Sequence, residues 1–392
     1  MTAPSNRPGK PLSRIVEAIP PSGIRRFFDL ASTMQGVVSL GVGEPDFPTP
    51  WTAREAAIHA LEHGATTYTS NSGLLELREA VCADLDARYG VSYSPDAECL
   101  VTSGVSEGLD LALRALLNPG DEVIVPEPAY VAYAPCVAFA GGVPVAVALD
   151  PADSHRLDAD RIAAAVTPRT KAVLYGTPSN PTGAAASASD LADLAALAVR
   201  EDLWLVADEI YDRLTYGGVH ACTAAAPGAW ERTVLLGGFS KSYAMTGWRV
   251  GYVAAPAGVA ALMHRIHQYT MLCAPHVSQV AALEAMRSAQ ADVEEMVADY
   301  DRRRRLFVKG LNELGLTCPE PGGAFYAFPS VTSTGLSSAE FAERLLAEQK
   351  VAVVPGDVFG PSGAGHVRCS YATALPQLEE ALERTGRFLA GL

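Results

Sequence analysis

The sequence predicts an α/β fold: a large domain with a mostly parallel sheet flanked by helices, plus a smaller α/β domain formed by the N- and C-terminal parts of the chain. Three observations lead to this prediction. Short apolar runs alternate with helical segments through the middle of the chain, as in parallel sheets covered on both faces. After a long helical tract over roughly 256–315, the pattern changes to shorter strands and helices. At 392 residues, the chain is also too long for one simple core.

Six apolar runs are the expected strands of the large sheet, at 100–102, 123–125, 143–147, 172–175, 204–207 and 233–236. Each run is continuously apolar rather than alternating, which predicts that all six strands are buried on both faces. In such sheets, ligands bind beyond the carboxyl ends of the strands. The polar residues that follow each run are therefore the candidates for function.

The smaller domain is expected to combine the two ends of the chain. Residues 1–49 would be an arm and part of that domain, 50–290 the large cofactor-binding domain, and 291–392 the C-terminal part. Within the arm, residues 1–20 are rich in proline and polar groups and should have little structure, whereas Ser22–Ala31 has the apolar spacing of a helix.

The C-terminal part is expected to contain strands at 324–328, 351–354 and 367–371, with helices near 338–349 and 375–390. The first of these helices has a clear start signal. Ser337 can cap it, and Glu340 completes a capping box.

Composition and charge exclude several classes of protein. A net charge of −14 makes nucleic acid or an anionic membrane a poor partner, and the basic cluster Arg302–Arg305 is interpreted as a solvated helix face. Seven scattered cysteines without a Cys-x-x-Cys pair indicate reduced thiols in a cytoplasmic protein. No apolar run approaches the ~20 residues of a membrane span, and the first residues lack the apolar core of a signal peptide. His264 and His267 share a helical face without a third ligand, so no metal is expected.

The first strands of the large sheet end in residues suited to a phosphate and a flat ring. Ser103–Ser106 follows the run at 100–102 and opens a helix, and a helix N-terminus with hydroxyls favours phosphate, although many helices are capped this way without a ligand. After the next run, Tyr130 or Tyr133 could stack on a ring or could equally pack in the core.

Two further strands end in an amide and a carboxylate. Asn180 lies between Pro178 and Pro181, which fix its backbone, although a plain turn would explain the prolines equally well. Asp208 ends an apolar strand, where a carboxylate is costly unless it meets a partner such as a protonated ring nitrogen. Tyr211, one helical turn on, could hydrogen-bond a neighbouring ring oxygen.

A lysine and two arginines complete the set. Lys241 lies among small, hydroxylated and aromatic residues, where an amine of lowered pKa can form a Schiff base with a carbonyl, although a lone loop lysine is usually solvated. Arg249 can hold a phosphate dianion through two hydrogen bonds. Arg368 stands amid apolar residues on a strand and needs an anion, for which a substrate carboxylate would serve.

Phosphate binding, ring stacking, partners for a ring nitrogen and a ring oxygen, and a Schiff-base lysine together describe pyridoxal 5′-phosphate. Over nearly its whole length, the sequence resembles class I aminotransferases of the fold-type I pyridoxal-phosphate family, in the aspartate, aromatic and broad-specificity branch. Four motifs carry the resemblance, in the family's order and spacing: Ser179–Gly183, Asp208–Tyr211, Gly238–Gly251 and the strand with Val367–Arg368.

The resemblance implies roles around the cofactor ring. Lys241 would hold the cofactor as a Schiff base and then move a proton to or from the substrate's α-carbon. Asp208 would keep the pyridine nitrogen protonated, which makes the ring an electron sink. Tyr211 and Asn180 would hold the phenolic oxygen, and Tyr130 would stack on the ring.

The resemblance also implies how the phosphate and the substrate are held. The phosphate would lie among Gly104, Val105, Ser106, Ser240 and Arg249. Tyr68 would reach it from a second subunit, so a homodimer is implied. Arg368 would bind the substrate's α-carboxylate, helped by Asn180 and the backbone at Gly43.

Two departures from the family's pattern bear on activity. Family members often have a serine where Gly238 stands, so one phosphate contact would be missing. Relatives specific for aspartate often have a basic residue at Ser106 or in the loop near 270–277, and neither place holds a lysine or arginine here. Unless His276 or a residue of the arm serves, a dicarboxylate side chain lacks a partner. The sequence therefore favours aromatic, other apolar or a broad range of amino acids.

The expected reaction is transfer of an amino group from an L-amino acid to a 2-oxo acid by a ping-pong mechanism. The alternative within enzymes keeps the cofactor and changes the chemistry to that of a lyase, a cyclase or an oxidase, because the protein selects which bond aligns with the ring's π system. A regulator that senses the cofactor is a third class. Such regulators carry a helix-turn-helix domain in front, for which the arm before Ser22 leaves no room.

Overall fold

The structure is a computed structural model that describes residues 11–21, 23 and 34–392. The helix expected over Ser22–Ala31 falls, except for Gly23, outside the described residues. The expectation of little structure before residue 21 is wrong in one place, because α1 (Arg14–Ala18) forms a short helix. None of its residues is buried, so local backbone bonding rather than core packing holds this turn.

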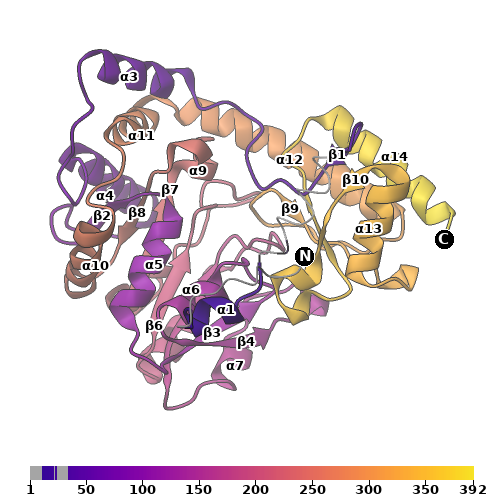
Figure 1. Cartoon of the computed structure of the whole chain (residues 1–392), viewed down its shortest axis with the longest axis horizontal. Coiled ribbons are helices and arrows are strands. Elements are labelled where there is room, and N and C mark those ends of the chain that lie inside the picture. Colours follow the sequence, from indigo (N-terminus) through magenta and orange to yellow (C-terminus); the bar gives the residue numbers. More distant parts are fainter. Residues whose placement is uncertain (1–10, 22, 24–33) are drawn as a thin grey trace.

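The large sheet has seven strands in the order β2-β8-β7-β6-β5-β3-β4 (Figure 1). The strands are β2 (Cys99–Thr102), β3 (Glu122–Glu127), β4 (Val143–Ala148), β5 (Thr170–Gly176), β6 (Trp204–Asp208), β7 (Thr233–Gly238) and β8 (Gly251–Ala254). Strands β3 to β7 are mutually parallel, whereas β8 is antiparallel to both β7 and β2. The predicted α/β fold with a mostly parallel sheet is confirmed, and β8 is the strand that the apolar runs did not include.

Helices cover both faces of this sheet. They are α3 (Trp51–Glu62), α4 (Leu75–Tyr89), α5 (Val105–Leu116), α6 (Tyr133–Phe139), α7 (Ala159–Ala163), α8 (Ala188–Arg200), α9 (Phe239–Ser242), α10 (Ala257–Thr270) and α11 (His276–Ser288). Successive residues of β3 show the two faces, because Val123 packs in one core cluster with Leu109 of α5. Its neighbour Ile124 packs in another cluster with Leu194 of α8. Successive side chains of β3 therefore point to opposite faces of the sheet and pack against helices on both sides.

The prediction that all six strands are buried on both faces is wrong for β4. Five residues of this strand are exposed or half-buried, and Val147 is its one buried residue. The physical reason is that β4 lies at an edge of the sheet, pairs only with β3, and packs against the short helices α6 and α7. At the opposite edge, β2 packs against the longer helices α4, α5 and α10 and is buried throughout. The apolar sequence of an edge strand therefore does not by itself predict burial.

The smaller sheets join the two ends of the chain. Strand β1 (Val38–Ser39) pairs in parallel with β10 (Val351–Ala352), and an antiparallel sheet has the order β11-β12-β9, from β11 (Val354–Pro355), β12 (Val367–Ser370) and β9 (Tyr326–Ala327). The long helix α12 (Gln290–Glu313), α13 (Ser338–Gln349) and α14 (Leu375–Ala390) pack around them (Figure 1). Domain boundaries at 49/50 and 290/291 stay a prediction.

Local signals define several elements. The capping box at Ser337 and Glu340 is present at the start of α13, as predicted. Short 3-10 helices complete the connections at Pro151–Asp153, Thr223–Ala225, Trp230–Arg232, Thr246–Trp248, Thr332–Thr334, Gly356–Phe359 and Pro361–Gly363. In the part of the chain that the structure describes, no helix is long and apolar enough to cross a membrane.

The interpretation of Arg302–Arg305 as a solvated face is wrong for its two central residues. Arg303 and Arg304 are 8% and 7% exposed. Arg303 pairs with Asp46 at 2.7 Å, and Arg304 pairs with Asp301 at 2.6 Å. Buried arginines need such anions, and the partner of Arg303 lies more than 250 residues away, where a local pattern cannot reveal it.

Candidate active site

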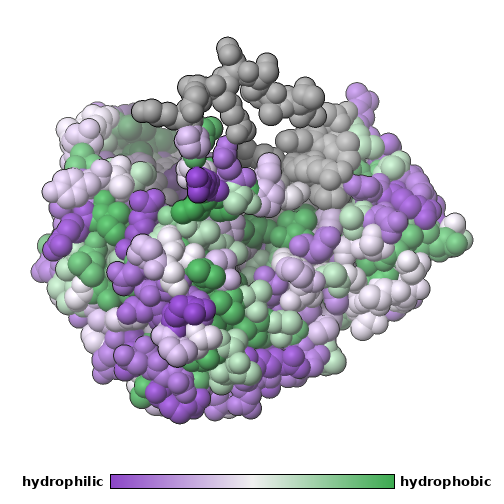
Figure 2. Space-filling view, turned by 60° about the horizontal axis from the view of Figure 1, so that its bottom comes forward, coloured by the Kyte–Doolittle hydropathy of each residue, from purple (hydrophilic) through white to green (hydrophobic). Residues whose placement is uncertain are grey.

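A cavity of about 1280 Å³ lies at the carboxyl edge of the large sheet. On the face seen in Figure 2, the surface is hollowed near its centre, and hydrophobic residues gather around the hollow. Most of the residues proposed from sequence line the cavity: Gly43, Val105, Ser106, Tyr130, Asn180, Asp208, Tyr211, Ser240, Lys241, Arg249 and Arg368. The structure therefore brings together side chains from both ends and the middle of the chain.

Lys241 lies on α9, directly after β7, and is half-buried. Its Nζ donates a hydrogen bond to the carbonyl oxygen of Gly43 at 2.6 Å. Burial lowers the pKa of Lys241 to about 8, and the nearby cations Arg368 and Arg249 act in the same direction. An amine with this pKa is partly neutral near pH 8, so it can act as a nucleophile or a base.

Asp208 ends β6 and is 7% exposed. Burial raises its pKa to about 6, against the hydrogen bond that Tyr133 Oη donates to Oδ2 at 2.8 Å. The amide of Ile210 adds a longer contact to Oδ1, at 3.3 Å. A buried carboxylate with an oxygen directed at a cavity is ready to accept a hydrogen bond from a cationic donor.

An anion site is formed where α5 begins. Gly104 precedes the helix with φ +76°, and a Cβ there would lie 2.6 Å from Nη2 of Arg249. The first amides of α5 have no acceptor within the helix. Ser240 is buried beside this corner. Arg249 forms no ion pair with any carboxylate of the described residues, and its Nη1 donates to the carbonyl of Thr246 at 3.2 Å.

The packing around Gly238, three residues before Lys241, leaves little room for the serine that the resemblance would lead us to expect there. A Cβ at this position would lie 3.1 Å from Gly251 Cα, Ile210 Cδ1 and Val105 Cγ2. Contacts this short force the neighbours to move, so a larger residue would be crowded. The packing of Val105 and Ile210 therefore accompanies the loss of the hydroxyl.

A second cation faces the cavity from the smaller sheets. Arg368 on β12 is 2% exposed, and it donates to Asn180 Oδ1 at 2.9 Å and to the Gly41 carbonyl at 2.7 Å. Its Nε has no hydrogen-bond partner, and it pairs with no carboxylate among residues 11–21, 23 and 34–392. The guanidinium lies 4.5 Å above the ring of Tyr326. A buried cation without an anion is costly, so this arrangement favours an anionic ligand.

Two tyrosines of the site make contacts that the sequence did not predict: Tyr326 was not proposed at all, and Tyr133 was proposed only as a residue that could stack on a ring or pack in the core. Tyr326 Oη shares a hydrogen bond of 2.9 Å with Tyr211 Oη, and it lies 2.5 Å from where a Cβ of Gly43 would be. Tyr133 contacts Asp208. Tyr326 lies in an apolar segment that resembles ordinary core, so no sequence signal distinguishes it, and the contact of Tyr133 with Asp208 spans 75 residues of sequence.

Two of the proposed residues do not line the cavity. Gly104 precedes α5, and a Cβ at this position would meet the Arg249 guanidinium. Tyr68 is 78% exposed on the surface, as a residue that serves a second subunit would be, although the single chain does not test that role. Within the described residues, no group of three or more histidine, cysteine or acidic side chains could hold a metal ion.

The fold and the cavity define an α/β enzyme with a reactive lysine and two cations for anionic ligands. The comparisons identify the family. The model of the family described as aminotransferase class I and II matches residues 35–384, and the chain belongs to this family. It is an aminotransferase, as predicted.

The relatives agree with this assignment. The chain is 56% identical to the putative aminotransferase YugH of Bacillus subtilis, over 96% of this chain and 98% of the relative. It is 45% identical, with the same coverage, to aromatic-amino-acid aminotransferase 2 of Thermococcus litoralis and to the aspartate aminotransferase of Pyrococcus abyssi. The crystal structure of an aromatic aminotransferase from Pyrococcus horikoshii superposes with a TM-score of 0.90 at 44% identity, over 94% of this chain and 99% of that one.

Proposed function

We propose that this aminotransferase uses pyridoxal 5′-phosphate to move an amino group from an L-amino acid to a 2-oxo acid in two half-reactions. One observation carries the proposal: the amine of Lys241, with its pKa lowered to about 8, lies in a cavity that also holds two arginines without carboxylate partners among the described residues. Two anionic groups, a phosphate at Arg249 and a carboxylate at Arg368, would fit such a site.

The residues present fit the cofactor. A Cβ on Gly104 would fill the space between this residue and the guanidinium of Arg249. With glycine there, the first amides of α5 and the guanidinium can both reach a phosphate. Asp208 would accept a hydrogen bond from the protonated ring nitrogen, and Tyr211 and Asn180 would hold the ring oxygen. The half-buried Tyr130 lines the same cavity as a stacking surface. When bound, the cofactor supplies an aldehyde carbon for an amine and a ring that withdraws electrons.

Lys241 would perform two tasks. Its Nζ would hold the cofactor between turnovers, and after the substrate amine replaces it, the neutral amine would remove the proton from the substrate's α-carbon. Removal of a proton requires the amine uncharged, and a pKa of about 8 leaves a useful neutral fraction at pH 7 to 8. Asp208, by remaining ionised, would keep the ring nitrogen protonated throughout.

The substrate would be held by its α-carboxylate at Arg368, whose Nε is without a partner in the protein. The same cavity is also lined by the apolar residues Pro21, Val42 and Val131. Its cationic side chains, among the residues described, are Lys241, Arg249 and Arg368, and all three have other roles. This lining supports aromatic, apolar or broad-range amino acids over aspartate alone.

The assembly that we propose is a cytoplasmic homodimer with shared active sites. Tyr68 is exposed in a loop whose Asn71 donates to the carbonyl of Leu272 at 2.6 Å. The end of α10 and the residue after it expose Tyr269 and Met271, so apolar side chains gather where this segment meets the loop of Tyr68. Exposed apolar patches of this kind favour subunit contact. All seven cysteines have free thiols, which supports a reducing compartment.

A single half-reaction tests the proposed chemistry. The purified protein with bound pyridoxal phosphate is mixed with L-phenylalanine and no 2-oxo acid. Transfer predicts one equivalent of phenylpyruvate per active site and conversion of the cofactor to its amine form, after which the reaction stops. Continuous release of ammonia or hydrogen peroxide would show lyase or oxidase chemistry instead.

A further inference from the structure

A buried tyrosine hydroxyl beside Asp208 has no role in the scheme above. Tyr133 is the first residue of α6 and is 3% exposed. Its Oη donates to Asp208 Oδ2 at 2.8 Å, and both side chains are buried. The contact joins a helix on one face of the sheet to the end of β6, across 75 residues of sequence.

The neighbouring strand leaves room for this hydroxyl. Gly176, the last residue of β5, is the register partner of Asp208 on β6. A Cβ at Gly176 would lie 2.8 Å from Tyr133 Oη. Any side chain at this position would displace the hydroxyl or the strand, so glycine here preserves the contact between Tyr133 and Asp208.

The other groups around Asp208 do not replace the hydroxyl. The amide of Ile210 reaches Oδ1 only at 3.3 Å. Glu209 is the nearest like charge, and its carboxylate is already occupied by His220 at 2.6 Å and by the amide of Thr223 at 2.7 Å. Lys241 acts on Asp208 as a more distant cation. Tyr133 therefore donates the shortest hydrogen bond to this carboxylate among the described residues.

We propose that Tyr133 is a positioning residue that fixes the Asp208 carboxylate, with Oδ2 bound to the hydroxyl and Oδ1 left to accept a hydrogen bond from the ring nitrogen of pyridoxal phosphate. The proposal rests on the proposed function for its ligand. A hydroxyl that donates to a carboxylate stabilises the charged form, and it also stops the group from rotating. A charged, correctly oriented Asp208 is what a protonated ring nitrogen needs.

Loss of the hydroxyl has a defined consequence. Burial already raises the pKa of Asp208 to about 6, and the hydrogen bond from Tyr133 opposes that rise. Without it, the pKa moves further up, toward neutral pH. A neutral carboxylic acid no longer attracts a pyridinium, so the ring nitrogen loses its anionic partner and the cofactor binds more weakly.

Two variants break the contact by different routes, and a third serves as the control. Tyr133→Phe removes the hydroxyl and keeps the ring, whereas Gly176→Ala displaces the hydroxyl from the neighbouring strand. Tyr175→Phe removes another buried hydroxyl of β5, which bonds Thr223 Oγ1 at 2.9 Å and does not touch Asp208. All three variants are compared by melting temperature to establish that they fold.

The measurement is the titration midpoint of Asp208, followed by ¹³C NMR of its carboxyl carbon in the full chain without cofactor. The signal is assigned by its disappearance in Asp208→Asn. Tyr133→Phe and Gly176→Ala should each raise the midpoint by about one pH unit, and each should raise the Kd for pyridoxal phosphate about fivefold at pH 6, where the ionised fraction of Asp208 falls from about one half to about one tenth. Tyr175→Phe should leave both values near those of the unaltered protein.

A midpoint in Tyr133→Phe equal to that of Tyr175→Phe would overturn the proposal, because a purely structural tyrosine would change only the melting temperature. Since the midpoint is measured without cofactor, it decides the role of Tyr133 independently of the reaction. Failure of the unaltered chain to bind pyridoxal phosphate would instead overturn the proposed function.

Discussion

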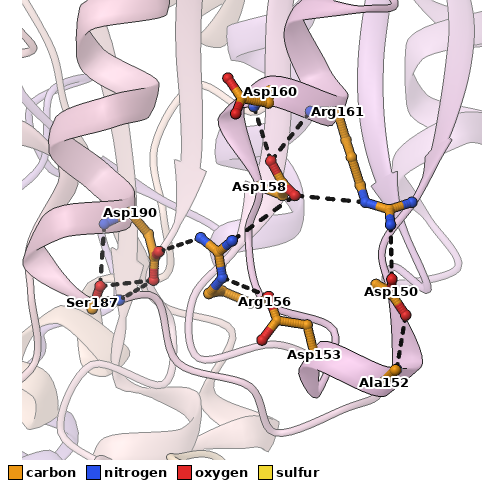
Figure 3. A network of polar contacts seen from close by, with 9 residues as sticks. All are labelled: Asp150, Ala152, Asp153, Arg156, Asp158, Asp160, Arg161, Ser187 and Asp190. Carbon is orange, nitrogen blue, oxygen red and sulfur yellow. Dashed lines mark hydrogen bonds and ion pairs between the residues drawn. The ribbon is translucent and has the colours of Figure 1, made fainter.

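Two groups of arginines in this molecule differ in what surrounds them. Arg156 and Arg161 lie at the surface in a network of aspartates beside α7 and α8 (Figure 3). Arg249 and Arg368 face the cavity and have no carboxylate partner in the described parts of the chain. The same side chain is thus neutralised by the protein in one place and left for a ligand in the other.

The surface network has a structural purpose. Arg156 pairs with Asp153 at 2.8 Å and with Asp190 at 2.9 Å, and Arg161 pairs with Asp150 at 2.8 Å. Asp190 also completes the capping box of α8 with Ser187. As Figure 3 shows, the network ties the segment after β4 to the start of α8. Both arginines in it already have aspartate partners, so neither is left for an anionic ligand.

The cavity has a different character, because Asp208 and Arg368 are buried and Lys241 is half-buried there, whereas Arg249 is exposed. Burial raises the pKa of Asp208 and lowers the pKa of Lys241, and in both cases it disfavours the charged form. Arg368 keeps a nitrogen without a partner. Unpaired or poorly solvated charges in a cavity therefore distinguish a functional site from a structural ion network.

Arg368→Met is expected to have the largest effect. It removes the partner of the substrate's α-carboxylate, so kcat/KM for L-phenylalanine should fall about 10³-fold, as for loss of a buried charged hydrogen bond. Activity with phenethylamine, which lacks the carboxylate, should hardly change. Arg156→Met is the matched control and should alter kcat/KM less than twofold. An equal loss in the two variants would refute the distinction between the regions.

Arg249→Met is expected to weaken cofactor binding. Loss of two charged hydrogen bonds to a phosphate corresponds to a Kd for pyridoxal phosphate raised about 100-fold. Fluorescence titration of the cofactor-free protein measures this change, with Arg161→Met as the control at the surface. Unchanged affinity in Arg249→Met would place the phosphate elsewhere.

Replacement of an aspartate by asparagine should have opposite effects on the free energy of unfolding in the cavity and in the surface network. Folding raises the pKa of Asp208 from 3.8 to about 6. The ionised Asp208 therefore lowers the free energy of unfolding; this loss is complete above pH 6 and disappears below pH 3.8. The pKa of Asp190 is lowered, so its contribution is present above pH 3.8 and is lost as pH falls through the folded value. At pH 8 without cofactor, Asp208→Asn should stabilise the fold by roughly 2 kcal/mol, whereas Asp190→Asn should destabilise it by about 1 kcal/mol.

Urea unfolding at pH 8 and again at pH 5 measures whether each substitution raises or lowers the free energy of unfolding. The gain in Asp208→Asn should shrink at the lower pH, because Asp208 is then largely protonated in the folded state. Stabilisation by both substitutions, or by neither, would contradict the assignment of one carboxylate to a costly site and the other to a stabilising network.

The smallest effect is expected from the surface network itself. Arg156 is partly exposed, so Arg156→Met should lower the free energy of unfolding by at most about 1 kcal/mol. The loss should diminish in 1 M NaCl, because salt screens exposed ion pairs. A loss that salt does not change would indicate that packing of the arginine stem, rather than charge, holds the segment.

Sequence reasoning found the parts of the site that depend on strand ends and short motifs. Asp208, Lys241 and Arg249 each follow an apolar run, and parallel strands bring their carboxyl ends to one edge of the sheet. The α/β fold followed from the same runs. These features are local in sequence and could be predicted.

The features that were missed depend on contacts between distant segments. Tyr133 and Tyr326 acquire their contacts only when α6 and β9 pack against the sheet ends. Arg303 is buried because Asp46 meets it from the other end of the chain. Whether β4 lies at an edge depends on strand order, which an apolar run does not encode. Such contacts are set by tertiary packing and not by the local sequence.

The central claim is that the cavity's lysine, and no surface lysine, holds pyridoxal phosphate. Reduction of the loaded protein with sodium borohydride, followed by proteolysis and mass spectrometry, tests this directly. The account predicts a phosphopyridoxyl group on Lys241 alone, and no adduct in Lys241→Ala. An adduct on Lys171, Lys309 or Lys350 at comparable yield, or retained activity in Lys241→Ala, would contradict it.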